Sequence, residues 1–97
     1  MKQINKTTKI PLIVIKLETQ EDRDKFDELQ GEFEDILWWL NEKHEQGIIG
    51  NDFNPNNLTW QGQEHDDYVQ FNLFYEDTGE LMKLIVTKTD NYTVEAF

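Results

Sequence analysis

The sequence contains no cysteine, which excludes a disulfide framework and any metal site built on thiolates. Long hydrophobic runs are also missing. The most apolar stretch, residues 10–17, is too short for the core of a secretion signal and far too short to span a bilayer. Basic residues are scarce, at nine against twenty acidic residues. We therefore expect a cytoplasmic protein that binds neither membrane nor nucleic acid directly.

Known catalytic signatures are absent as well. The chain has no glycine-rich phosphate loop, no GxSxG nucleophile turn and no HExxH zinc motif. Carboxylates are abundant, but carboxylates on a solvated surface do not form the buried pair with separated pKa values that acid–base catalysis requires. The sequence thus predicts a protein that is not an enzyme and that uses no metal ion or cofactor.

What the sequence does contain is enough apolar material for one small core. Of its 97 residues 37% are hydrophobic, and they include six Phe, three Tyr and three Trp. This composition predicts a single domain over residues 1–97, with a frayed polar end at residues 1–9. The net charge of −11 is unevenly distributed: residues 17–82 carry eighteen acidic and three basic residues, a local net charge of −15.

Hydrophobic periodicity predicts one long helix. Apolar residues recur at intervals of three and four between residues 26 and 40, so they form a single stripe along a helix. Thr19 suits an N-cap, with Asp22 three residues later as in a capping box. Gly47 suits the residue just after the helix, followed by Ile48 as the hydrophobic contact of a Schellman ending. The helix is expected from about residue 19 to about residue 46, and Gly31 in its middle could bend it.

The remaining segments favour β-structure. Residues 10–17 are apolar on both faces, which predicts a strand that is covered on both sides or paired centrally, with Pro11 at its start or on an edge. Strands are also expected at residues 58–63, 67–75, 81–88 and 92–97, and the short turns between them favour antiparallel pairing. The predicted fold is α+β in the order β-α-β-β-β-β, with the helix packed on a small antiparallel sheet in two layers.

Two adjacent tryptophans provide the main functional clue. Neighbouring helical residues point about 100° apart, so Trp39 falls beside the apolar stripe and Trp38 falls on the outward side. We predict a partner-binding site on that outward side. Its residues are Trp38, Asp24, Asp27, Glu34, Asp35, Glu42 and Glu45.

Three interpretations of Trp38 remain open from the sequence. Tryptophan is enriched at the centres of interfaces, and surrounding carboxylates select a basic partner. Alternatively, residues 48–53 or the N-terminal arm cover Trp38, because an exposed indole forgoes a large gain from burial. A homo-oligomer that buries the indole is the third interpretation.

The density of acidic residues suggests what such a partner does. Residues 18–45 contain eleven acids over about 40 Å of expected helix, close to the spacing of about 3.4 Å between charges on one DNA strand. In its overall type, a small acidic α+β domain, the chain is similar to nuclease-immunity proteins and phage-encoded inhibitors of host defences. The prediction is a binding protein that occupies the basic site of a nucleic-acid-binding partner, with DNA mimicry as one mode.

Two alternatives belong to other functional classes. The first is a small enzyme or ligand-binding module with a site around His65, which lies beside Glu64, Asp66 and Asp67 in a polar turn. Adjacent residues of a turn rarely converge on one ion, so a polar hairpin turn is the simpler interpretation. The second alternative is a regulatory or assembly subunit that acts as a homo-oligomer.

Overall fold

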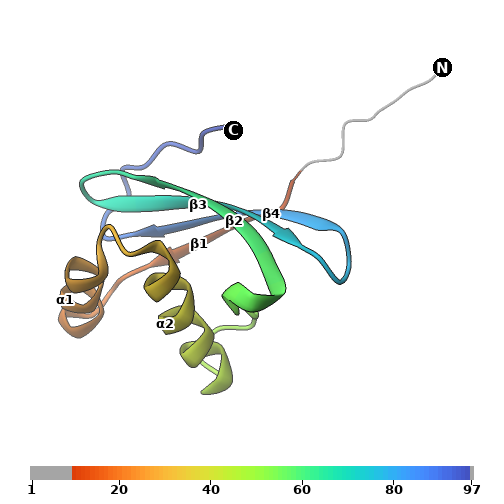
Figure 1. Cartoon of the computed structure of the whole chain (residues 1–97). Coiled ribbons are helices and arrows are strands. Elements are labelled where there is room, and N and C mark those ends of the chain that lie inside the picture. The colour runs from red at the N-terminus through yellow and green to blue at the C-terminus, as the bar shows by residue number, and fades with distance from the viewer. Residues whose placement is uncertain (1–9, 97) are drawn as a thin grey trace.

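The computed structural model describes residues 10–96, where two helices cover one face of a four-stranded sheet (Figure 1). The predicted frayed end at residues 1–9 lies outside the described residues. No helix of the described part is long and apolar enough to cross a lipid bilayer. In chain order the elements are β1 (Leu12–Lys16), α1 (Gln20–Leu29), α2 (Phe33–Glu45), the short 3-10 helix η1 (Pro55–Asn57), β2 (Leu58–Glu64), β3 (Tyr68–Tyr75) and β4 (Glu80–Thr87).

The strands lie in the order β1-β4-β3-β2. As the short connections predict, β2, β3 and β4 are antiparallel neighbours. The prediction of a wholly antiparallel sheet is wrong for β1, which lies parallel to β4. Parallel strands need a long connection, and the two helices and two further strands between β1 and β4 provide it. β1 is also an edge strand rather than a central one. This position suits Pro11, whose carbonyl accepts a hydrogen bond from the backbone N–H of Lys83 (2.9 Å).

The expected strand at residues 92–97 is also wrong. Residues 91–96 have no regular secondary structure, and Phe97 lies outside the described part. This segment crosses the sheet face opposite the helices, and it pairs with no strand edge (Figure 1). Its backbone at Glu95 is held by side chains instead, since Gln70 and Lys83 both donate hydrogen bonds to the Glu95 carbonyl.

The single long helix predicted over residues 19–46 is in fact two helices. α1 ends at Leu29 and α2 begins at Phe33, and Gly31 between them has a φ of 90°, a conformation that favours glycine. The Gln30 side chain donates hydrogen bonds to the carbonyls of His65 (2.8 Å) and Asp66 (3.2 Å). These bonds tie the break to the turn between β2 and β3, so a distant part of the chain also holds the interruption in place.

The outer ends of the predicted helix are confirmed. The Thr19 hydroxyl accepts a hydrogen bond from the backbone N–H of Asp22 (3.1 Å) and caps α1. At the end of α2, Gly47 has a φ of 79°, and the N–H of Ile48 donates to the carbonyl of Lys43 (2.9 Å), as in a Schellman ending. Both features depend only on residues close in sequence.

The apolar stripe forms the helical side of the core. Phe26 on α1 and Ile36, Leu37 and Leu40 on α2 are fully buried against the sheet. Phe33 lies directly on β2, where a Cβ atom added to Gly62 would be 2.7 Å from its ring. The buried strand residues that complete this core are Leu58, Val69, Phe71, Leu73, Leu84 and Val86.

The break between the helices generates a first prediction. Gly31→Ala should lower the free energy of unfolding by about 1 to 2 kcal/mol, because an L residue is strained in the left-handed conformation. Gly50→Ala is the matched control, since Gly50 does not have a positive φ and an added methyl group meets no atom within 4 Å. Urea unfolding measures both variants. Equal stabilities would show that the break does not depend on glycine.

Tyr75 generates a second prediction, on pH. Its hydroxyl donates a hydrogen bond to the carbonyl of Asp52 (3.0 Å), and burial, followed by the carboxylates of Asp52 and Glu80, raises the pKa of Tyr75 to about 12. The unfolded chain releases this proton near pH 10, so the stabilisation is complete below pH 10 and is lost as the pH rises to about 12. Urea melts over this window should show a steeper loss in the natural chain than in Tyr75→Phe. Parallel curves would contradict the assignment.

Candidate functional site: the outer face of α2

Trp38 is surrounded by carboxylates on the side of α2 that faces away from the sheet. Glu34 and Asp35 precede it by four and three residues, and Glu42 and Glu45 follow it by four and seven. Residues at these spacings are neighbours on one face of a helix. All four acidic side chains are exposed. The four acids of α2 that the sequence prediction grouped with Trp38 therefore lie near it on the same helix.

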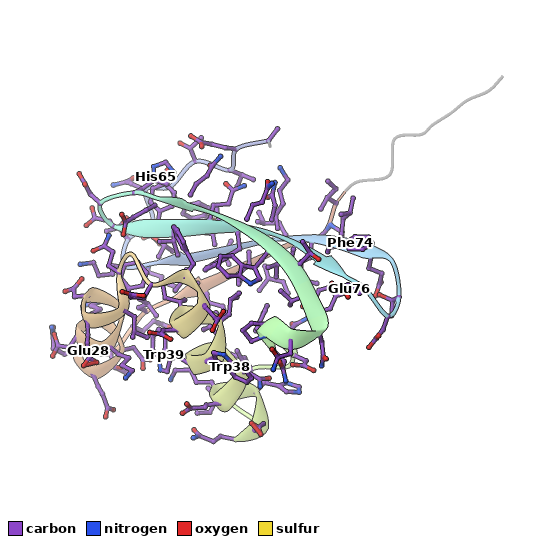
Figure 2. The ribbon with its side chains drawn as sticks, in the orientation of Figure 1. Glu28, Trp38, Trp39, His65, Phe74 and Glu76 are labelled. Carbon is purple, nitrogen blue, oxygen red and sulfur yellow. The ribbon has the colours of Figure 1, made fainter. Side chains whose placement is uncertain are left out.

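An open hollow of about 270 Å³ lies where this face meets α1. Asp35 and Glu42 are two helical turns apart and line the hollow between the two indoles, Trp38 on one side and Trp39 on the other. Figure 2 shows both tryptophans on α2, with Glu28 on the neighbouring α1. The lining residues are Lys25, Leu29, Asp35, Trp38, Trp39 and Glu42. Sequence reasoning did not find Lys25 and Leu29, because they reach the site only through the break at Gly31.

Asp24 and Asp27 are not part of this arrangement. Asp27 accepts a hydrogen bond from the ammonium group of Lys88 (2.8 Å), and Asp24 accepts one from the side-chain amide of Gln20 (2.9 Å). Neither residue lines the hollow. The reason is the break at Gly31, since the projection that grouped these two acids with Trp38 assumes one continuous helix.

The two tryptophans have different environments. Trp39 packs against the core, as its place beside the apolar stripe predicts, and the ammonium of Lys43 lies 5.4 Å from the centroid of its ring. Trp38 is partly buried rather than fully open, and it lines the hollow with part of its surface. Within residues 48–53 the Ile48 side chain is 61% exposed, whereas Phe53 is fully buried in the core.

Basic side chains near the hollow are already paired with α1. Lys43 forms an ion pair with Asp22 (3.0 Å), which links α2 to α1, and Lys25 forms one with Glu28 (3.3 Å). Within residues 10–96, none of the ion pairs involves the acids around Trp38. Those acids are Glu34, Asp35, Glu42 and Glu45. The outer face of α2 therefore presents four carboxylates that no described basic side chain neutralises.

The side chain of His65 contacts other parts of the protein. The imidazole stacks on the ring of Tyr68 with 4.3 Å between centroids, and its Nε2 lies 3.9 Å from a carboxylate oxygen of Glu95. Asp66 and Asp67 are exposed. Over residues 10–96, no three side chains of the types that bind metals come together. These contacts connect the turn to Tyr68 on β3 and to Glu95 in the segment after β4.

Comparisons with known proteins leave the function to be inferred from these residues. No protein-family model matches this chain, and no curated protein or solved structure shows a match. The outer face of α2 therefore stands as the candidate site on its own geometry. It combines a hollow lined by two indoles, two carboxylates and Lys25, which is paired with Glu28, with two further carboxylates on the same helix face.

The different environments of the two indoles generate a third prediction. Trp38→Ala should lower the free energy of unfolding by about 1 to 2 kcal/mol. This value lies between the effect of a surface substitution and the effect of removing a fully buried aromatic side chain. Trp39→Ala should cost more, because it removes a contact with the core and the partner of the Lys43 ammonium. Denaturant melts give both values. A larger loss for Trp38→Ala would show that Trp38 is mainly a structural residue.

Proposed function

We propose that this protein is a small acidic inhibitor that occupies the basic site of a nucleic-acid-binding partner. The observation that supports the proposal best is the face of α2 on which Trp38 lies among four carboxylates without basic partners in the described chain. An interface hot spot usually consists of a buried aromatic or arginine anchor, with polar groups around it that give specificity. Trp38 and its surrounding acids have this composition.

The hollow suits the side chain of an arginine or lysine from the partner. A guanidinium group can stack on an indole and also form paired hydrogen bonds to a carboxylate, and the hollow supplies both kinds of group at Trp38, Asp35 and Glu42. The contact between Lys43 and Trp39 is an example of a cation over an indole in the same helix. The proposed inhibitor thus binds a basic side chain that would otherwise contact phosphate.

The charge density favours this mode over a copy of duplex DNA. α2 has 13 residues and a length of about 20 Å, so its four outer acids provide about one charge per 5 Å. A single DNA strand carries one charge per about 3.4 Å and the duplex one per about 1.7 Å. α2 alone is therefore sparser than either, and the proposal requires only that it compete for a few basic residues. Cytoplasmic phage-encoded inhibitors of host defences and nuclease-immunity proteins are the functional classes that this proposal favours.

A charge-reversal experiment tests the proposal. The natural chain, immobilised, should capture a basic nucleic-acid-binding protein from an extract of cells that encode it, and added duplex DNA should displace that protein. Asp35→Lys with Glu42→Lys should abolish the capture, because it reverses the charge in the hollow. Asp66→Lys with Asp67→Lys is the matched control, since it makes the same change in net charge at an exposed turn that does not line the hollow.

Trp38→Ala measures the aromatic part of the site. With the captured protein purified, this variant should bind about thirtyfold more weakly, equivalent to about 2 kcal/mol, as expected for an interface hot spot. Equal losses in the α2 variant and the turn control would show that binding depends only on net charge. A captured protein that DNA does not displace would contradict the inhibition of a nucleic-acid site.

A further inference from the structure

A second surface lies on the side of the sheet opposite the helices (Figure 1). The strand register places Leu12, Val14, Phe74 and Leu81 on this side, because they alternate with residues of the helix-covered core. Within residues 10–96, every exposed large hydrophobic side chain except Ile48 comes from this side or from the segment that crosses it. These side chains are Ile10, Leu12, Val14, Phe74, Leu81 and Val94.

The segment after β4 covers only part of this side. The Gln70 side chain accepts a hydrogen bond from the N–H of Glu95 (2.7 Å) and donates one to its carbonyl, which also accepts one from the ammonium of Lys83 (2.8 Å). Gln70 and Ile85 are fully buried beneath this segment. Among the described residues this cover ends at Ala96, which lines a hollow of about 280 Å³ together with Ile10 and Leu81. We call the uncovered area the open face, defined by Ile10, Leu12, Phe74 and Leu81.

The sequence of β1 is that of a strand with both sides covered. Its side chains alternate between the helical core, where Ile13 and Ile15 pack, and the opposite side, where Leu12 is 43% exposed and Val14 37% exposed. An edge strand with one solvated side normally carries polar residues on that side. A contiguous apolar patch on a small protein marks an interaction surface. Residues 10–96 therefore leave the open face only partly covered.

Charge on the open face is arranged on two sides of an apolar centre. Phe74 of β3 pairs with Leu81 of β4, and Lys83 lies two residues further along β4. Glu76 lies two residues beyond Phe74. Because β3 and β4 are antiparallel, Glu76 and Lys83 lie on opposite sides of the Phe74–Leu81 pair. The Glu76 carboxylate accepts a hydrogen bond from the hydroxyl of Thr59, which pairs with Phe74 on the same side of the sheet. The carboxylate of Glu76, the apolar pair and the ammonium of Lys83 thus follow one another in order, although the partly buried ammonium also donates to the Glu95 carbonyl.

This order is self-complementary, and we propose that the open face binds a second copy of this chain. A two-fold axis that lies in the interface above the Phe74–Leu81 pair, perpendicular to the strands, places Glu76 of each copy against Lys83 of the other, while the apolar side chains meet between them. The carboxylates of α2 lie on the far side of the sheet in each copy. Two chains with a net charge of −11 each can therefore meet here without bringing those carboxylates together.

Sedimentation equilibrium of the full chain tests the proposal, from about 1 μM to about 1 mM to include weak association. The natural chain should form a dimer as concentration rises. Leu81→Asp should weaken self-association at least tenfold, because it places a charge at the apolar centre. Ile48→Asp is the matched control, since Ile48 is 61% exposed but lies beyond the end of α2, and it should leave the dimer unchanged. Circular dichroism verifies that both variants fold.

A charge swap tests the symmetry of the interface. Glu76→Lys and Lys83→Glu should each weaken the dimer at least tenfold, and the double variant should regain most of the loss because the pair is restored with its signs exchanged. A natural chain that stays monomeric up to 1 mM overturns the proposal. So does a dimer that Leu81→Asp leaves intact, or an open face that binds only a different protein. Trp38→Ala should not affect self-association, and therefore the two proposals succeed or fail separately.

Discussion

The contact between Phe33 and the backbone of β2 at Gly62 determines where the second helix lies. A ring that close to a strand requires glycine beneath it, since a Cβ atom would be 2.7 Å away. Phe33 is also the first residue of α2, directly after the break held by Gly31 and by the hydrogen bonds of Gln30. Once the start of α2 is fixed in this way, its helical period decides which residues face the core and which carry Trp38 and the acids outward.

Local features of the fold could be predicted from sequence, and features that depend on distant contacts could not. The Thr19 cap, the Gly47 ending and the strands β2, β3 and β4 follow from residues close in the chain. The sequence indicated a bend at Gly31, but it did not predict two separate helices, because Gln30 bonds to carbonyls some 35 residues away. The parallel position of β1 and the loss of the last strand also depend on tertiary contacts, the latter on side chains of Gln70 and Lys83.

The same distinction between local and distant contacts applies to the residues of the candidate site. The acids around Trp38 on α2 required only the period of one helix, and the structure places them together. The prediction for Asp24 and Asp27 assumed that the helix continues through residue 31. These two residues instead bond to Gln20 and Lys88, away from Trp38. The hollow itself depends on Lys25 and Leu29 from α1, and no pattern within α2 indicates them. A sequence period thus predicts a face of one helix, whereas a concave site between two helices depends on the angle at which they meet.

The sheet separates two surfaces of different chemistry. The carboxylates of α2 lie beyond the helical layer, and the open face lies on the other side with Phe74 and Leu81 at its centre. Figure 2 shows this separation, with Trp38 and Trp39 on the helices and Phe74 at one end of the sheet. Each surface can therefore be changed by mutation with little effect on the other, except through the stability of the core between them.

This back-to-back placement has a consequence for avidity. In the proposed dimer, two copies joined at the open face would carry their α2 helices outward on opposite sides, with no linker segment between the two copies. Binding of one helix then fixes the position of the other, so its effective concentration at a second basic site depends on the thickness of the dimer. A target with two such sites at that separation would be held far more tightly than a target with one. The spacing of sites on the target would then contribute to specificity, in addition to the chemistry of each site.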